Sequence, residues 1–263
     1  MIAMTQPPLK IIAIETSAQI GSVALGENSQ LIEETSFTED KRHVAELLTH
    51  LDRLCRKHHF RPADIDRIYV SQGPGSYTGL RVGITAAKTL AFAHPIRLIP
   101  VPTSDILVLN LENDPHLDKN PDSTPIAIIS DAGQDRIYVS IYRKTPNEAP
   151  SAKHPVPNRQ KIAPSTVMTL DEFLEKSPRP LLILGEPLEF YREKLTAGGI
   201  THLPQSVWQP HARNVLRCGW LREKYRLFIQ PDQLAPIYPR RPLPEEKREA
   251  QLSEKSTSPK PTP

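Results

Sequence analysis

Residues 70–83 read VSQGPGSYTGLRVG and hold four of the eleven glycines of this chain. An apolar run, residues 65–71, leads into this stretch, and a helical pattern continues from it to Ala93. Strand, Gly-rich loop and helix therefore follow one another directly. Glycines at such a junction permit positive φ and let backbone N–H groups converge at the helix N-terminus, where an anion such as phosphate is stabilised.

The loop is not a P-loop, because Leu80 and Arg81 stand where that motif requires Lys and Ser or Thr. Three interpretations remain open for it. The first is a tight structural turn, the second is an anion or nucleotide site, and the third is a contact with another protein.

Three short β-rich runs before the loop predict a three-stranded meander: residues 10–16, 21–26 and 31–37. From residue 41 to residue 59, apolar residues recur at spacings of three and four, which predicts an amphipathic helix. Its apolar stripe is expected to face a sheet or another chain.

The pattern beyond the loop helix predicts a second β-then-α unit. The expected elements are a strand at 97–102, a short helix ending near residue 111, a hairpin of 125–132 and 136–142, a helix at 170–176, a strand at 180–185, a helix at 189–195 and a last helix at 212–228. Thr103 or Ser104 is expected to cap the short helix.

Two halves and a tail are expected from this order. The first half is residues 1–111 and the smaller second half is residues 112–238, with polar, Pro-rich insertions at 113–124 and 144–164. Residues 239–263 have almost no apolar side chains and are expected to be a disordered tail. Most of the excess of 28 prolines over 11 glycines falls in these peripheral segments.

The composition indicates which partners and which cellular compartment to expect. The 263 residues carry a formal net charge of +3, too small a surplus to require a nucleic acid or a membrane as partner. Cys55 and Cys218 lie in helical patterns and are expected to be buried reduced thiols, which suits the cytoplasm. The sequence shows neither a signal peptide nor an apolar run long enough to span a membrane.

Two further clusters carry groups that suit a ligand. Glu15, Thr16 and Ser17 end the first strand, where a carboxylate and two hydroxyls meet a turn that holds phosphate or metal-bound water in nucleotide-binding meanders. Residues 131–138, DAGQDRIY, could offer a carboxylate to a ligand between the halves. Ordinary strand-end capping and a β-turn explain the two clusters equally simply.

No catalytic or metal-binding residue is predicted. His43 and His50 are seven residues apart, so the i, i+4 pair of a zinc-binding helix is missing. The segment GPGSY also departs from the Gly-x-Ser-x-Gly pattern of a nucleophilic serine.

Six segments resemble, in order and spacing, the bacterial TsaB (YeaZ) family. They are IIAIETS, SVAL, KRHVAELL, VSQGPGSYTGLRVGITAAKTLA, PVPTSDIL and SDAGQDRIYVSIY, and together they cover roughly residues 9–142. The resemblance implies an α/β fold of the duplicated actin/Hsp70-like (ASKHA, RNase H-like) type, with two halves that are each a β-meander plus helices.

The resemblance also implies a function. Members of this family are non-catalytic partner subunits of TsaD in forming N6-threonylcarbamoyladenosine (t6A) at position 37 of tRNAs that read codons beginning with A. The expected partners are TsaD in a heterodimer, the ATPase TsaE and a second copy of the chain, with tRNA contacted through the complex. ATP or ADP with magnesium at the partner interface is the cofactor that could be involved.

Two sets of site residues follow. A remnant nucleotide site is expected at Glu15, Thr16, Ser17, Gly73, Gly75, Ser76 and Gly79. A partner interface is expected on the helices at 41–59 and 78–93, through Val44, Leu47, Leu51, Val82, Gly83, Ala86, Ala87 and Leu90.

The second half departs most from the family pattern, because Arg136 replaces a frequent Glu and Pro239 replaces a usual Leu. The competing hypothesis is an enzyme of the actin/Hsp70-like superfamily that hydrolyses a nucleotide or transfers a phosphoryl group, using Glu15 with the loop at 73–79.

Overall fold

The structure is a computed structural model that describes residues 7–38, 43–112, 124–145, 150–152 and 156–238. The strands are β1 (Lys10–Glu15), β2 (Ile20–Glu27), β3 (Gln30–Thr38), β4 (Arg67–Gly73), β5 (Arg97–Pro102), β6 (Ile126–Gly133), β7 (Arg136–Lys144), β8 (Arg159–Lys161), β9 (Thr166–Thr169), β10 (Leu182–Leu184) and β11 (Thr201–His202). The helices are α1 (His43–Lys57), α2 (Tyr77–Ala93), α3 (Thr103–Val108), α4 (Leu170–Lys176), α5 (Leu188–Ala197) and α6 (Ala212–Lys224).

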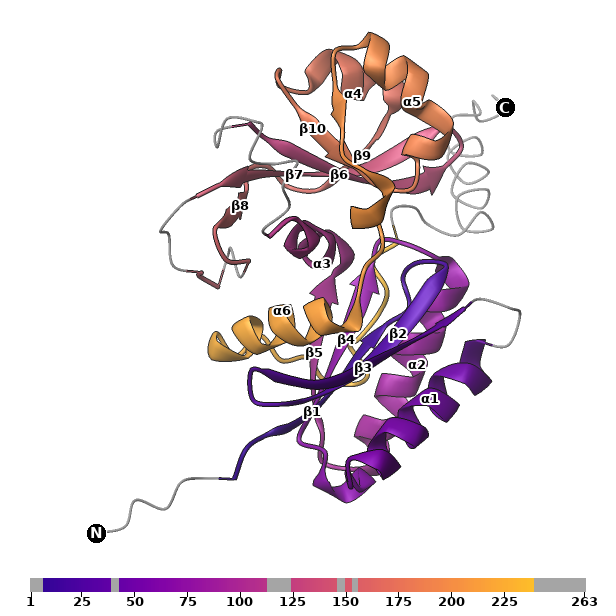
Figure 1. The fold of residues 1–263 in the computed structure, drawn as a ribbon, viewed down its shortest axis with the longest axis vertical. Coiled ribbons are helices and arrows are strands. Elements are labelled where there is room, and N and C mark those ends of the chain that lie inside the picture. Colours follow the sequence, from indigo (N-terminus) through magenta and orange to yellow (C-terminus); the bar gives the residue numbers. More distant parts are fainter. Residues whose placement is uncertain (1–6, 39–42, 113–123, 146–149, 153–155, 239–263) are drawn as a thin grey trace, which may run out of the picture.

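The first sheet has the order β3-β2-β1-β4-β5. β1, β2 and β3 pair antiparallel, as the predicted meander requires, while β4 and β5 add parallel to the other edge of β1. Figure 1 shows this sheet in the lower half of the molecule, with α1 and α2 on one face and α6 on the other.

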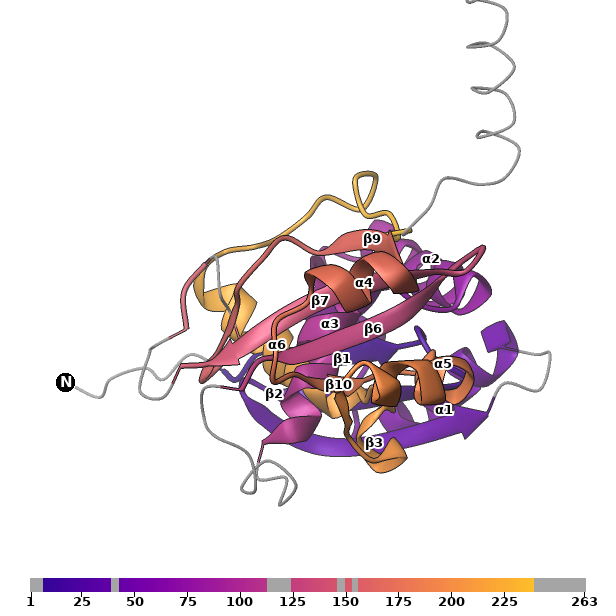
Figure 2. The same ribbon diagram turned by 90° about the horizontal axis from the view of Figure 1, so that it is seen from above.

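The second sheet repeats this order. β6 and β7 form the predicted hairpin, β9 pairs antiparallel with β7, and β10 and β11 add parallel to the other edge of β6. With β9 taken as the partner of β7, the order β9-β7-β6-β10-β11 matches β3-β2-β1-β4-β5, which confirms the predicted duplicated fold; β8 is a sixth strand that also pairs with β7. Figures 1 and 2 show α4 and α5 on the face of this sheet that is turned away from α3.

Three short strands were missing from the sequence-based prediction. β8 and β9 pair with successive parts of β7, and β11 pairs with β10 over two residues. β8 lies inside the segment 144–164 that was expected to be a mere insertion, so part of this segment completes the second sheet. The predicted tail at 239–263 and most of the insertion at 113–124 lie outside the described residues.

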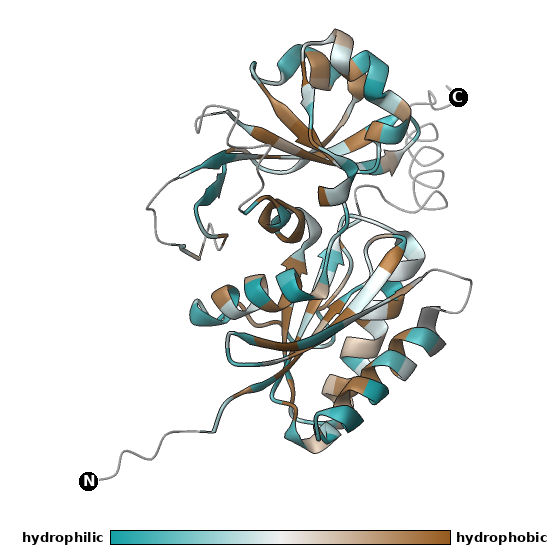
Figure 3. Ribbon diagram, in the orientation of Figure 1, coloured by the Kyte–Doolittle hydropathy of each residue, from teal (hydrophilic) through white to brown (hydrophobic). Residues whose placement is uncertain are grey.

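Both faces of the first sheet are buried, and they belong to different cores. Ile12 and Ile14 face α1 and α2, whereas Ile11 and Ala13 face α6 and α3. The second of these cores continues without interruption into the second half. Figure 3 shows the hydrophobic residues concentrated in the strands between these layers. No helix in the described part of the chain is long and apolar enough to cross a membrane.

Two predictions about local structure are wrong. α3 follows Pro102 at its N-cap position, and neither Thr103 nor Ser104 caps it, because both residues already belong to the buried helix. The predicted half at 112–238 also includes α6, which instead packs on β1, β2, β4 and β5 of the first sheet. The chain therefore returns to the first half for its last helix.

α6 sits close to the first sheet because Gly219 lies on the ring of Tyr69. A Cβ atom at Gly219 would lie 2.2 Å from Cδ2 of Tyr69. The Tyr69 hydroxyl in turn donates to Glu223 Oε2 at 2.5 Å, and this bond ties the far end of the helix to β4.

We expect Gly219→Val to lower the free energy of unfolding by about 1–3 kcal/mol, because the added side chain overpacks the contact with Tyr69. Lys224→Val, at an exposed position near the end of the same helix, is the control and should change stability by less than about 0.5 kcal/mol. Urea unfolding measures both values. Equal stabilities of the two variants would contradict the packing that we describe.

Candidate functional site

The Gly-rich loop lies directly against the end of β1. The Ser76 amide donates to the Ser17 carbonyl at 2.8 Å. A Cβ atom at Gly75 would lie 2.2 Å from the Ser17 carbonyl oxygen, and one at Gly79 would lie 2.1 Å from the Thr16 carbonyl oxygen. Of the three interpretations of the loop, the structural one accounts for these two glycines, since only glycine permits backbone to approach backbone so closely.

The remaining loop positions are also explained by contacts within the chain. Gly73 has φ +102°, and a Cβ atom there would lie 2.7 Å from the Ile237 carbonyl oxygen of the C-terminal segment. Ser76 is the N-cap of α2, and its Oγ accepts from the Gly79 amide at 3.2 Å. A helix N-terminus that is capped in this way offers fewer free N–H groups to an anion.

The space at the loop is very small. The cavity between Ser17 and Gly75 on one side and Ser130 and Gly185 on the other has a volume of about 30 Å³. A void of this size holds about one water molecule. The predicted nucleotide-site residues are thus brought together at one place, beside this small cavity.

A larger groove of about 740 Å³ lies between the two halves, next to this cavity. Its lining includes Asp131 and Asp135 from the β6–β7 turn and Glu186 and Glu189 from the start of α5, and none of its described lining residues is Lys or Arg. Residues 131–138 therefore do offer carboxylates to the space between the halves, as the sequence suggested. Four carboxylates disfavour the negatively charged phosphates of a nucleotide.

Glu15, the last residue of β1, is fully buried. Its Oε1 accepts from the amide and from the hydroxyl of Ser17, both at 2.5 Å, while its Oε2 has no partner among the described residues. Burial raises the pKa of Glu15 to about 7, and the hydrogen bonds from Ser17 oppose this shift. The unpaired oxygen suits a bound water or cation, but the described residues include no group of three or more His, Cys, Asp or Glu side chains that could hold a metal ion.

The predicted interface residues divide into two groups. Leu47, Leu51, Gly83 and Ala87 are buried within the chain, where they offer little side-chain surface to a partner. Leu47, Leu51 and Ala87 lie in the core between the helices and the first sheet. A Cβ atom at Gly83 would lie 2.3 Å from Thr16 Oγ1, so this glycine serves the packing of α2 on β1.

The other predicted residues lie on a groove between α1 and α2. Val82, Ala86 and Leu90 line it together with Leu48 and Tyr77, while Arg81 and three threonines at 78, 85 and 89 complete the lining, and its volume is about 600 Å³. We call the hollow lined by these residues the helix groove. The side chain of Val44 lies outside the described residues.

Leu48 and Tyr77 were missed in the sequence, although they are 45% and 50% exposed. A signal for Leu48 exists, because Leu48, Asp52 and Cys55 recur at i, i+4 and i+7 and form a second stripe on α1, beside the stripe that faces the sheet. Tyr77 lies at the first position of α2 and contacts the ring of Tyr238 at a centroid distance of 4.9 Å.

The same strand order occurs in both mixed sheets. This repeat places the chain in the class of duplicated actin/Hsp70-like folds. Residues 31–169 match the protein family TsaD, described as tRNA N6-adenosine threonylcarbamoyltransferase. Because the match covers more than half of the chain, the chain belongs to this family.

Individual relatives divide between two kinds of protein. The "tRNA threonylcarbamoyladenosine biosynthesis protein TsaB" of Bacillus subtilis is 29% identical over 71% of this chain and 75% of its own length. The "tRNA N6-adenosine threonylcarbamoyltransferase" of Staphylococcus saprophyticus is 36% identical, but over 35% of this chain and 31% of its own length. The alignment thus leaves out more than two thirds of that transferase.

A solved structure confirms the fold. "YeaZ from Pseudomonas aeruginosa" superposes with a TM-score of 0.67 over 88% of this chain and 99% of its own, at 20% sequence identity. The resemblance to the TsaB (YeaZ) family that the motifs carry is therefore confirmed.

We expect Gly79→Ala to destabilise the chain by more than about 1 kcal/mol, because the Thr16 carbonyl is backbone and cannot move aside as a side chain could. Thr78→Ala, at the exposed neighbouring position of the same helical turn, is the control. Thermal unfolding of both variants tests this. A Gly79→Ala variant as stable as Thr78→Ala would show that the close approach is not what the glycine provides.

We expect stability to fall as the pH rises from about 4.5 to about 7, because unfolded Glu15 ionises near 4.5 while folded Glu15 keeps its proton until about 7. The resulting penalty above pH 7 is on the order of 3 kcal/mol. Glu15→Gln stays neutral and should lack this fall, so its stability relative to wild type should improve between pH 4.5 and pH 8. Urea unfolding across this range measures it, with Glu175→Gln on the exposed surface of α4 as control. Parallel profiles for wild type and Glu15→Gln would contradict the buried, proton-binding carboxyl.

Proposed function

We propose that this chain is a partner subunit, without transferase activity of its own, that works with a TsaD-type protein in forming t6A at position 37 of tRNAs that read codons beginning with A. The observation that carries the proposal is the closure of the loop at Gly75 and Gly79 by the backbone of Thr16 and Ser17. What remains beside the loop is about 30 Å³. A loop that packs on its own backbone in this way leaves the chain to contribute to the reaction through a surface.

The helix groove is the surface that we assign to the partner. It exposes the apolar side chain of Leu48 and the ring of Tyr77 next to the partly buried Val82 and Leu90. Apolar side chains that gather on one face of a protein and leave a groove between two helices are typical of protein–protein contacts. A second copy of the chain would use the same face when the partner is absent, and TsaE would join the heterodimer.

The competing hypothesis of a nucleotide-hydrolysing enzyme finds little support. The groove between the halves has room for a nucleotide, but its four carboxylates repel phosphates that carry no metal ion. ATP or ADP with magnesium at the partner interface stays a prediction, as does the cytoplasmic location. The unpaired Glu15 Oε2 is the one group here that would suit a magnesium-bound water.

Reconstitution of tRNA modification tests the proposal. We expect t6A formation by TsaD, TsaE and the threonylcarbamoyl-AMP synthase to require this chain, and we expect Leu48→Asp to weaken binding to TsaD at least tenfold by placing a charge in the apolar groove. Phe190→Asp, at a residue that is 82% exposed and lies outside the helix groove, is the matched control and should bind like wild type. Modification that proceeds fully without this chain would overturn the proposed function.

A further inference from the structure

The groove of about 740 Å³ between the two halves concentrates negative charge, and we call it the acidic groove. Its lining includes Asp131, Asp135, Glu186 and Glu189, and none of its described lining residues is Lys or Arg. The whole chain, by contrast, carries a formal net charge of +3. The negative charge is thus a local feature of this groove, and it attracts cations to one place on the molecule.

The two carboxylates of the β6–β7 turn have neutral hydrogen-bond partners. Asp131 Oδ1 accepts from the Gly133 amide at 2.9 Å, and Asp135 Oδ1 accepts from the Tyr191 hydroxyl at 3.5 Å. Neither carboxylate forms an ion pair with a described residue. Desolvation and the charges of Asp135 and Asp131 raise the pKa of the Tyr191 hydroxyl, which agrees with a negative potential in the groove.

The carboxylate of Glu189, in the first turn of α5, has a neutral partner as well. Its Oε1 accepts from Gln205 Nε2 at 3.0 Å. Lys194, further along the same helix, lies 2.6 Å from Asp171 Oδ1 and is therefore engaged outside the groove. The charge of Glu189 is left for a ligand.

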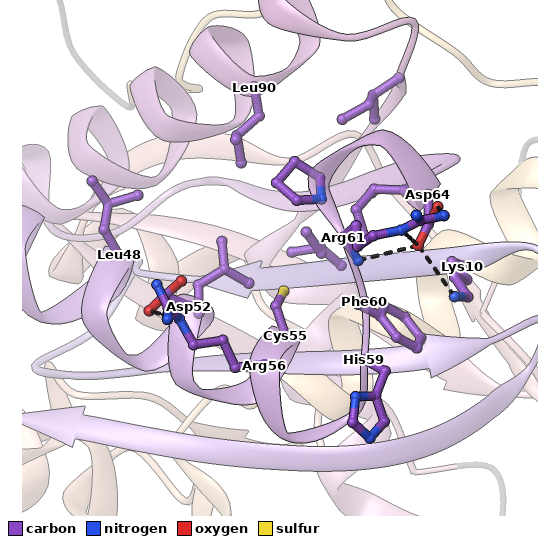
Figure 4. Close-up of a pocket in the computed structure, with 15 residues that line it drawn as sticks. Lys10, Leu48, Asp52, Cys55, Arg56, His59, Phe60, Arg61, Asp64 and Leu90 are labelled. Atoms are coloured by element: carbon purple, nitrogen blue, oxygen red, sulfur yellow. Dashed lines mark hydrogen bonds and ion pairs between the residues drawn. The ribbon is translucent and has the colours of Figure 1, made fainter.

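A hollow of about 1020 Å³ near the C-terminal end of α1 shows the opposite arrangement. Arg56 Nε lies 2.7 Å from Asp52 Oδ2, and Arg61 Nη2 lies 2.9 Å from Asp64 Oδ1 (Figure 4). The charged groups around this hollow thus neutralise one another. Of the two hollows, the acidic groove is the one whose charges call for a cation from outside the chain.

Aromatic side chains line the acidic groove next to the carboxylates. Phe190 is 82% exposed, and Tyr191 and Trp208 belong to the same lining. The Trp208 ring already has a cation near it, since Arg192 Cζ lies 6.0 Å from its centroid. The Phe190 ring is therefore the face that is open to a ligand, and an aromatic face attracts cations and buries methylene groups.

The small cavity of about 30 Å³ adjoins the acidic groove, because Ala18, Glu186 and Trp208 line both. Thr103 lines the small cavity and is 3% exposed, and its Oγ1 has no hydrogen-bond partner among the described residues. A buried hydroxyl without a partner is costly. This atom, which belongs to a different element from the carboxylates, calls for a polar group in the cavity.

The size of the small cavity selects the head group of the cation. A void of this volume holds about one water molecule, and a primary ammonium group is of similar size. An ammonium group donates three hydrogen bonds, for which the Thr103 hydroxyl offers an acceptor, while Glu186 supplies the opposite charge. A planar guanidinium or a trimethylammonium group is too large to enter.

We propose that the acidic groove binds a linear polyamine such as spermidine. One primary ammonium group enters the small cavity beside Thr103, the methylene chain lies against Phe190, and the other cationic centres meet the carboxylates of the groove. These carboxylates come from the β6–β7 turn and from the start of α5, so charges spaced along a flexible chain reach both, whereas one small cation does not. The inference concerns the isolated chain and is independent of the proposed function.

Isothermal titration of the full chain at about 0.15 M salt tests the site. We expect one spermidine to bind with a Kd below about 1 mM. Hexamethylenediamine should bind at least tenfold more tightly than hexamethonium, which has the same chain and charge but trimethylammonium heads. Equal binding of these two would show diffuse attraction by negative charge, and a spermidine Kd far above 1 mM would show no site. Either result would overturn the proposal.

Two matched double variants test the groove. Asp135→Asn with Glu189→Gln removes two charges at nearly constant shape and should weaken spermidine binding at least tenfold. Glu175→Gln with Glu193→Gln makes the same change of charge at exposed positions outside the groove, and should bind within about twofold of wild type. Equal affinities of the two double variants would contradict the assignment of the carboxylates.

Thr103→Val tests the small cavity. The substitution removes the unpartnered hydroxyl, so it should weaken spermidine binding about fivefold or more without lowering the melting temperature. An unchanged affinity would overturn the placement of the ammonium group. If the variant does not fold, the ratio of the affinities for hexamethylenediamine and hexamethonium, measured on the wild-type chain, decides.

Two competing ligands give the remaining outcomes. Nα-acetyl-lysine amide carries a single ammonium group and should bind at least tenfold more weakly than spermidine; equal binding would assign the groove to a lysine side chain of a protein and overturn the proposal. Magnesium ATP should leave bound spermidine in place. If magnesium ATP binds in the groove and displaces spermidine, the groove is a metal–nucleotide site and the inference is overturned.

Discussion

The backbone contact between the start of α2 and the end of β1 is the constraint on which the rest of the first half depends. At Gly75 and Gly79, carbonyl oxygens of Ser17 and Thr16 occupy the positions that a Cβ atom would need. One turn further, Gly83 brings the helix equally close to the Thr16 side chain. α2 is therefore held against the sheet at a distance that larger residues would not allow, and α1 packs beside it. The same contact places the backbone after β1 directly against the loop, so one constraint both builds the helix layer and fixes the course of the loop.

The two halves are joined by a shared core and by a polar junction at Asp105. This residue of α3 is 5% exposed, and its Oδ1 accepts from the Tyr142 hydroxyl of β7 at 2.6 Å. Lys161 of β8 and Arg222 of α6 bring their charges to 3.5 Å and 3.6 Å from its two oxygens. A buried carboxylate with three such partners loses several of them if the halves separate, which is costly. The junction thus helps to keep the second sheet in place over α3.

The sequence predicts the first half well, because its strands and helices have strong local patterns and glycines mark the loop. It misses β8, β9 and β11, which are two to four residues long and owe their existence to pairing with β7 and β10. It also places α6 in the wrong half, since a helical pattern does not say which sheet the helix covers. The sequence is equally unable to say which side chains of α1 are exposed. Leu47 and Leu48 are neighbours in the sequence, but only the fold decides that Leu47 is buried under the sheet and Leu48 is 45% exposed.

The burial of Glu15 shows how the two faces of the first sheet differ. In this structure the carboxyl is buried with one oxygen unpaired, and its raised pKa means that it lowers stability at neutral pH. The two faces of the first sheet explain how the chain tolerates this. The face of Glu15 merges with α3, α6 and the second half into one large core, which supplies ample apolar burial. The opposite face is covered by α1 and α2, and the groove beside these helices exposes Leu48 and Tyr77. Burial of Glu15 on one face and exposure of the helix groove beyond the other are thus two consequences of the same layering.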